Sequence, residues 1–259
     1  MGRPEPAAVE RMFTAIAWRY DLVNLVLSQA QDRRWRRRAA QLARVAAGDR
    51  ALDVCTGTGA LARLLRRRVG PAGEVVGIDL TPAMIDLARR RGSSVRYLVG
   101  DATQIPFPDG YFDAATVAFG LRNIADPEAA LAELARVVRP GGRVVILEFS
   151  TVKWPLRAAY RWYSRALIPR LARLLLGRDE AYRYLTESIA AFPPPRTVSG
   201  WLSRSGLRAE RARTMTGGVV AIHVGVRPRQ APAVSALVPP EGSGSESRRP
   251  APAAPRPRA

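Results

Sequence analysis

The sequence predicts a doubly wound α/β fold, in which helices cover both faces of a mainly parallel sheet. Between residues 50 and 149, short apolar segments alternate with helical segments of about ten residues, an order typical of such sheets. A glycine-rich loop follows the first apolar segment, as it does in nucleotide-binding sheets. The hydrophobic fraction of 47% over 259 residues suits one sizeable domain with elaborations.

Seven strands are expected from the apolar segments and the turns that bound them. Five form the parallel part of the sheet, at 50–54, 74–79, 95–99, 112–119 and 143–149. The helices that alternate with them are expected at 59–69, from Thr81 onward with Pro82 in the first position, and from Asp126 to about Val138. A helix at 198–205 precedes the last two strands, 207–213 and 218–225, whose tight turn predicts an antiparallel hairpin at the end of the sheet.

Helical segments flank this core. Residues 1–48 are expected to form a helical extension, with helices at 9–28 and 32–47, and residues 153–191 a helical insert or lid. All of these belong to one predicted domain, 1–228. Residues 229–259 are dominated by Pro, Ala, Ser and Arg without periodicity, which predicts a disordered tail.

The composition excludes several classes of protein. No apolar run reaches the roughly 18 to 20 residues of a membrane-spanning helix, and the N-terminus has no apolar leader. The single cysteine, Cys55, excludes an internal disulfide and a multi-cysteine metal site, so no metal is predicted. A cytoplasmic protein is expected, and its oligomeric state is left open.

The net charge of +19 indicates a basic surface. Such a surface suits nucleic acid, anionic lipid or an acidic metabolite. A GC-rich codon usage would also favour arginine, since Lys153 is the only lysine in the chain. No nucleic-acid-binding motif is visible, so nucleic acid is the least expected of these partners.

The loop after the first strand indicates a nucleotide-type cofactor. Its residues Gly57, Thr58 and Gly59 form the start of a G-x-G-x-x-A pattern, which fits a dinucleotide and S-adenosylmethionine equally well. Asp79 ends the second strand, 20 residues after Gly59, where an acid can bond both ribose hydroxyls. Asp53 favours S-adenosylmethionine over a dinucleotide. A carboxylate at this loop repels the pyrophosphate of a dinucleotide and attracts the ammonium and sulfonium groups of S-adenosylmethionine. The alternative for Asp53 is a structural role in capping the turn.

A second group of residues, after the third strand, favours the same cofactor. Asp101 can accept from the exocyclic amine of adenine, and the backbone N–H of Ala102 can donate to a ring nitrogen. Together with Asp53, the glycine loop and Asp79, these residues lie at the carboxyl ends of three successive strands. The sequence therefore predicts an S-adenosylmethionine site.

The chain also resembles a known family, the C-methyltransferases of quinone biosynthesis, over roughly residues 9–228. The motifs that carry the resemblance are YDLVN (20–24), LDVCTGTG (52–59), PFPDGYFD (106–113), FGLRNIAD (119–126), RPGGRVVILEFS (139–150), YRYLTESI (182–189) and TGGVVAIHVG (216–225). FGLRN and YRYLTESI are far more specific than a general methyltransferase loop. The resemblance implies a class I methyltransferase fold and C-methylation of a prenylated quinol, most simply demethylmenaquinol.

The resemblance further implies cofactor contacts at Thr58, Asp79, Asp101, Ala102 and Ala118. Two positions depart from the family pattern. Ala60 stands where the family usually has aspartate, and Ala118 where serine is frequent, so any contact at Ala118 is through its backbone or by packing.

Catalytic candidates are expected at the carboxyl ends of the fourth and fifth strands. Arg122 could steady a phenolate or orient a water, and Asn123 could hold the other ring oxygen. Glu148 would be a proton acceptor if burial raised its pKa. Structural roles are the alternative for Arg122 and Glu148. His223, in an apolar strand, and Cys55 are interpreted as core residues.

The helical insert offers a means of reaching a polyprenyl substrate. Residues 154–176 interleave Trp, Tyr and Leu with Arg, a pattern that suits the headgroup layer of an anionic membrane, and equally a lid over the core. A peripheral position on the cytoplasmic membrane face is therefore expected. Three alternative functions remain: methylation of the ubiquinone precursor, methylation of another lipophilic small molecule, and, more distantly, nucleic-acid binding.

Overall fold

The computed structural model describes residues 6–16, 28, 30–150, 152 and 180–229. The described residues up to Arg229 belong to one compact unit. Three expected features lie wholly or largely outside the described residues: the second half of the first helix, the 154–176 segment of the insert, and the C-terminal tail. Within the described ranges, none of the helices is both long and apolar enough to cross a bilayer.

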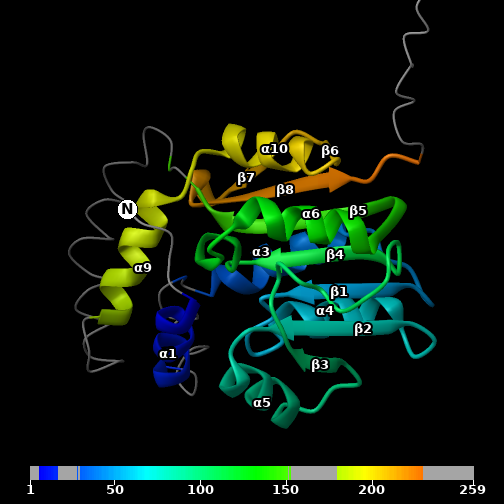
Figure 1. Ribbon diagram of the computed structural model, residues 1–259, viewed down its shortest axis with the longest axis horizontal. Coiled ribbons are helices and arrows are strands. Elements are labelled where there is room, and N and C mark those ends of the chain that lie inside the picture. The colour runs from blue at the N-terminus through cyan, green and yellow to red at the C-terminus, as the bar shows by residue number, and fades with distance from the viewer. Residues whose placement is uncertain (1–5, 17–27, 29, 151, 153–179, 230–259) are drawn as a thin grey trace, which may run out of the picture. The chain divides into compact units, whose positions relative to one another are not determined.

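A mixed, eight-stranded sheet forms the centre of this unit, with neighbours in the order β3-β2-β1-β4-β5-β8-β6 and with β7 also paired to β8 (Figure 1). Its strands are β1 (Arg50–Val54), β2 (Glu74–Asp79), β3 (Arg96–Val99), β4 (Phe112–Ala118), β5 (Val138–Phe149), β6 (Arg208–Ala209), β7 (Arg213–Met215) and β8 (Val220–Val226). The first five run parallel, whereas β8 is antiparallel to β5, β6 and β7. The chain order reverses between β1 and β4, which confirms the doubly wound fold with an antiparallel hairpin.

Helices cover both faces of the sheet. The helices are α1 (Pro6–Ile16), α3 (Gln31–Leu42), α4 (Ala60–Val69), α5 (Pro82–Arg90), α6 (Pro127–Val137), α9 (Glu180–Ala191) and α10 (Pro195–Arg204), with short 3-10 turns η2 (Leu121–Asn123) and η4 (Thr216–Gly218). Buried residues of α3, α4 and α5 share one hydrophobic cluster with the sheet, and those of α6 and α10 share another. Helices α1 and α9 lie beyond the carboxyl ends of the parallel strands, on the left in Figure 1.

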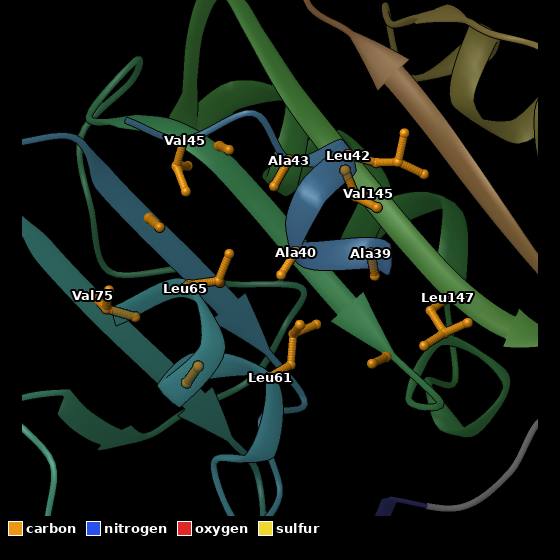
Figure 2. Close-up of a cluster of buried hydrophobic side chains, with 14 of the residues drawn as sticks. Ala39, Ala40, Leu42, Ala43, Val45, Leu61, Leu65, Val75, Val145 and Leu147 are labelled. Atoms are coloured by element: carbon orange, nitrogen blue, oxygen red, sulfur yellow. The ribbon is translucent and has the colours of Figure 1, made fainter. Parts of the chain in front are cut away.

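The cluster under α3 and α4 shows why these sequences form helices that pack on the sheet. Small residues such as Ala39 and Ala40 let α3 approach closely, and Leu61 and Leu65 fill the space between α4 and the strands (Figure 2). Each of these four side chains is at most 2% exposed. Burying such a leucine contributes about 1.5 to 3 kcal/mol relative to exposure.

Several boundaries differ from the sequence prediction. The second helix ends at Leu42 rather than Ala47, because Arg44 adopts a left-handed φ of 54° and turns the chain. Strand β5 begins at Val138, which already pairs with Phe112, whereas the sequence predicts a start at Arg143. The pairing with β4 is irregular between these two residues.

The closing hairpin also differs from its prediction. The expected strand 207–213 is divided into β6 and β7, although Glu210 still donates its N–H to the Val224 carbonyl at 2.8 Å. Strand β8 starts at Val220, because Gly217 and Gly218 take positive φ values in the preceding turn.

Candidate functional site

The glycine loop leaves β1 and turns sharply into α4. Cys55, Gly57 and Gly59 have φ values of 52°, 55° and 78°, in the left-handed region that glycine adopts most readily. At Gly59 a second constraint applies, since a Cβ atom would overlap the Tyr97 hydroxyl from β3. The glycines therefore allow the sharp turn from β1 into α4, and they leave space at this edge of the sheet because they carry no side chain.

Asp53 lies beneath this loop. Its carboxylate is 1% exposed and accepts hydrogen bonds from the hydroxyls of Thr116 at 2.6 Å and Thr56 at 2.7 Å. Burial raises the pKa of Asp53 to about 6, although the two threonine bonds and the charge of Arg36 lower it in part. Asp53 does not line the pocket described below, so its predicted effect on a bound cation would act through space.

Asp79 joins the glycine loop to the start of α5. It accepts the N–H of Gly57 at 2.7 Å and the N–H of Thr81 at 3.0 Å, and burial raises its pKa. It also lines a pocket at the carboxyl ends of the parallel strands. Asp79 thus orders the loop while presenting a carboxylate to the pocket.

The wall of the pocket after β3 offers a donor beside an acceptor. Asp101 uses Oδ1 to accept the N–H of Thr103 at 2.8 Å. Its Oδ2 and the N–H of Ala102 have no hydrogen-bond partner among the described residues. Leu80, 39% exposed, adds an apolar surface to the same pocket. This arrangement fits the edge and face of a flat heterocycle that carries an amine next to a ring nitrogen.

The pocket is acidic in a strongly basic protein. Its described lining includes four carboxylates, from Glu10, Asp79, Asp101 and Asp126, and no arginine or lysine. Since the whole chain has 41 basic and 22 acidic side chains, this lining favours a cationic ligand and disfavours a pyrophosphate. Glu10 of α1 and Asp126, the N-cap of α6, were not predicted, because no local pattern places either of them at this edge.

Only some of the residues predicted to contact the cofactor line the pocket. Gly57 and Ala118 line the pocket, as Asp101 and Ala102 do, whereas Thr58 and Gly59 do not. Thr58 is buried and its carbonyl accepts from Arg63 at 2.7 Å. The roles of these residues in cofactor binding stay predictions.

Arg122 and Glu148 form a buried ion pair rather than facing the pocket. Arg122 Nη1 lies 2.7 Å from Glu148 Oε1, with side chains 6% and 0% exposed. The carboxylate also accepts the N–H groups of Phe149 and Arg122, and the guanidinium donates to the Phe119 carbonyl at 2.7 Å. Neither residue lines the pocket. The geometry favours the structural alternative, in which the pair holds the η2 turn against β5.

Asn123, the third catalytic candidate, does line the pocket. Its Oδ1 accepts the hydroxyl of Tyr184 from α9 at 3.1 Å, and its Nδ2 lies 3.4 Å from the Phe119 carbonyl. Burial raises the pKa of Tyr184, so its hydroxyl is a neutral donor at physiological pH. Tyr184 was not singled out by sequence reasoning, although it lies in the YRYLTESI motif.

The residues interpreted as core behave differently from one another. Cys55 lines the pocket, but burial and the neighbouring acids raise the pKa of its thiol, so it is no nucleophile. His223 is 2% exposed and burial lowers its pKa to about 4, which keeps it neutral. Its Nδ1 has no partner among the described residues. The described residues contain no cluster of three or more side chains that could hold a metal ion.

Comparison with known proteins identifies the family. The profile of the ubiE/COQ5 methyltransferase family matches residues 2–227. The chain belongs to the ubiE/COQ5 methyltransferase family. This confirms the resemblance carried by the FGLRN and YRYLTESI motifs.

Several relatives within the ubiE/COQ5 family match over most of their length. A demethylmenaquinone methyltransferase of Thermus thermophilus is 50% identical over 222 residues, covering 84% of this chain and all of the relative. A demethylmenaquinone methyltransferase of Mycobacterium marinum is 44% identical, covering 87% and 96%. A ubiquinone/menaquinone biosynthesis C-methyltransferase of Stutzerimonas stutzeri is 40% identical, covering 85% and 89%.

Solved structures support the fold. An S-adenosylmethionine-dependent methyltransferase of Thermotoga maritima superposes with a TM-score of 0.61 at 18% identity, covering 85% of this chain and 99% of the other. A Haloferax volcanii methyltransferase in complex with the Trm112 activator gives 0.60 at 20% identity, covering 83% and 97%. The class I, Rossmann-like methyltransferase fold is thereby confirmed.

Proposed function

We propose that this ubiE/COQ5 family member transfers a methyl group from S-adenosylmethionine to a ring carbon of a reduced, prenylated quinone precursor, and that this precursor is demethylmenaquinol. The observation that carries the proposal is the 50% identity, over the entire length of the relative, to a protein named demethylmenaquinone methyltransferase. Relatives named for both ubiquinone and menaquinone biosynthesis are 40% identical. The ubiquinone precursor is therefore the second candidate substrate.

The residues of the pocket fit S-adenosylmethionine. Asp79 would accept from the ribose hydroxyls, and Asp101 and the Ala102 N–H would meet the adenine edge, where an acceptor and a donor are unpaired. Gly57 and Gly59 leave room for the methionine portion, and Ala118 would contribute packing. The four carboxylates of the lining complement the ammonium and sulfonium. When bound, this cofactor supplies a methyl group that needs no further activation.

The chain's own residues would then orient the quinol. Asn123 lies in the pocket, where its Oδ1 accepts from Tyr184 and one N–H of its Nδ2 donates to the Phe119 carbonyl. The second N–H of Nδ2 would then hold a ring oxygen of the quinol. The Arg122–Glu148 pair fixes the turn that carries Asn123, since Arg122 and Asn123 are neighbours in η2. Positioning of this kind is the main contribution that a protein makes to methyl transfer.

A prenylated quinol resides in a lipid bilayer, so we also propose that the protein works as a peripheral protein on the cytoplasmic membrane face. The expected role of the 153–191 insert, as a lid or as a membrane contact, falls largely outside the described residues and stays a prediction.

The test is an assay of the full chain with radiolabelled S-adenosylmethionine and reduced demethylmenaquinone in detergent. Label should appear in menaquinone, and the oxidised quinone should not be methylated because its ring carbon is not nucleophilic. Asp79→Ala should lower the incorporation, and Asp86→Asn, a surface control on α5, should not. Labelling of the ubiquinone precursor alone would replace the first substrate by the second, and labelling of neither would refute the proposal.

A further inference from the structure

The outward face of α3 carries arginine and no carboxylate. Arg33, Arg34, Arg37 and Arg38 are exposed along one stripe of the helix, together with Gln41. The opposite side, with Trp35, Ala39 and Leu42, is buried against the sheet; Figure 2 shows the last two of these. The one acid of the helix, Asp32, lies 3.9 Å from the buried Arg36 and does not belong to the outward stripe.

This arrangement is costly for the isolated helix. Arg33 and Arg37, and likewise Arg34 and Arg38, are like charges four residues apart, which destabilise a helix. The arginines also occupy the amino-terminal two-thirds of α3, with none in its last turn, although cations are favoured at a helix carboxyl end. The stripe therefore does not stabilise α3.

The arginines of the neighbouring helices α4 and α5 are placed differently from those of α3. Three of the four arginines of α4 and both arginines of α5 lie in the last turn, at Arg66, Arg67, Arg68, Arg89 and Arg90, where they interact favourably with the helix dipole. Those arginines have a local electrostatic explanation. The stripe on α3 has none.

Basic residues are also distributed unequally between the two faces of the sheet. On one face, α3 holds five arginines and one acid, α4 four arginines and no acid, and α5 two arginines and one acid. On the other, α6 holds one arginine and two acids, and α10 two arginines and no acid. Codon usage would spread arginines over both faces, so it does not explain this difference.

The buried side of α3 packs against a residue that lines the pocket. Trp35 Nε1 donates to the Thr216 hydroxyl at 2.8 Å, and its ring lies 6.1 Å from that of Phe119. Arg36 lies over the same Phe119 ring at 5.2 Å. Because Phe119 lines the pocket, α3 is packed directly behind the pocket wall, with its arginines pointing to solvent.

We infer that Arg33, Arg34 and Arg37 form a docking surface for the phosphate groups of an anionic lipid membrane. The side chains of these three residues have no hydrogen bond or ion pair within the part of the chain that the structure describes, whereas the Arg38 guanidinium donates to the Gln41 side chain at 2.9 Å. The choice of lipid rests on the proposed function, whose substrate is held in a bilayer. The aromatic ring of α3, Trp35, is buried, so this helix offers no ring on which a nucleic-acid base could stack.

The test compares two triple variants of the full chain by co-sedimentation with phosphatidylcholine vesicles, either pure or containing about one-third phosphatidylglycerol. The first variant is Arg33→Gln, Arg34→Gln, Arg37→Gln. The matched control is Arg67→Gln, Arg68→Gln, Arg90→Gln, which removes the same charge from exposed arginines in the last turns of α4 and α5. Each arginine near an anionic surface strengthens partition roughly fivefold.

The α3 variant should therefore lose about a hundredfold in partition onto anionic vesicles, and the control at most a few-fold. Wild-type binding should weaken as salt is raised above about 0.1 M. The thermal midpoint of the α3 variant should be unchanged or higher, because glutamine is a good helix former and like-charge repulsion is relieved. A fall in the midpoint with vesicle binding retained would show that the arginines are structural and would overturn the inference.

Equal losses in the two variants would show an effect of net charge alone and would also overturn it. So would wild-type binding to a DNA duplex, lost in the α3 variant, without binding to vesicles. Methylation of the quinol in detergent is measured in parallel and should survive in both variants. If detergent activity is absent but the α3 variant alone loses vesicle binding, the proposed function fails and the docking surface stands.

Discussion

Replacing Asp53 by asparagine should make the protein more stable at neutral pH while weakening cofactor binding. Asp53 is fully buried, and its pKa in the folded chain is about 6, against 3.8 for the unfolded residue. The folded state therefore holds this proton more tightly than the unfolded state. Its contribution to stability is present below pH 3.8 and is lost as the pH rises toward 6.

The size of the effect follows from the pKa difference. About two pKa units correspond to about 3 kcal/mol of unfolding free energy. Asp53→Asn retains the shape of the side chain and removes this titration. The free energy of unfolding of the variant, relative to that of the wild type, should rise by about 2 to 3 kcal/mol between about pH 4 and pH 8.

Cofactor binding should change in the opposite sense. A bound cation favours ionised Asp53, so it should return the pKa toward the ordinary value. If it does so fully, the wild-type dissociation constant at pH 5 should be about tenfold higher than at pH 7.5. Asp53→Asn should bind more weakly at pH 7.5 and show much less of this pH dependence.

Urea unfolding at several pH values measures the first effect, and calorimetric titration with S-adenosylmethionine measures the second. Asp86→Asn is a suitable control, because Asp86 lies on the surface of α5 with its side chain 58% exposed. Parallel stability curves for wild type and Asp53→Asn would refute the reasoning, since they would show that Asp53 does not titrate differently in the folded chain.

Three further predictions concern the rest of the site. Asp79→Ala should weaken cofactor binding by about 2 to 4 kcal/mol in calorimetry, because charge-assisted bonds to the ligand and the anchor of the glycine loop are both lost; an unchanged dissociation constant would exclude Asp79 from the site. Glu148→Leu alone should lower the unfolding free energy by about 3 to 5 kcal/mol, and adding Arg122→Met should recover most of it, since a buried charge is then no longer unpaired. Full activity of that double variant would show that the pair has no catalytic part. Gly59→Ala should destabilise the loop and abolish cofactor binding, because its Cβ would overlap the Tyr97 hydroxyl at a positive φ; adding Tyr97→Leu should restore folding only in part, because the backbone strain remains.

The order of strands and helices could be predicted from the sequence, because it depends on local patterns. Strands β1 and β2 lie where their apolar residues predict them, and Asp126 caps α6 by accepting the N–H of Ala129 at 3.1 Å. Among the boundaries that were predicted wrongly, the start of β5 is set by tertiary pairing. Val138 belongs to β5 because Phe112 lies opposite, 26 residues earlier in the chain.

The gathering of Asp79, Asp101 and the glycine loop at one edge could also be predicted, since parallel strands end on the same side of a sheet. The direction in which each side chain points could not be predicted from the sequence. Asp53 and Asp79 both end strands, yet Asp53 turns beneath the loop to two threonines and Asp79 lines the pocket.

The sequence by itself determined the fold class, the glycine loop and the family, since all three reside in contiguous motifs and in the spacing of apolar residues. Only the tertiary structure decided that Glu148 is paired with Arg122, that Glu10 and Asp126 make the pocket acidic, and that the arginines gather on one face. The physical reason is that burial and electrostatic environment depend on which side chains approach across the sheet. That approach is set by packing between distant segments, and no local pattern records it.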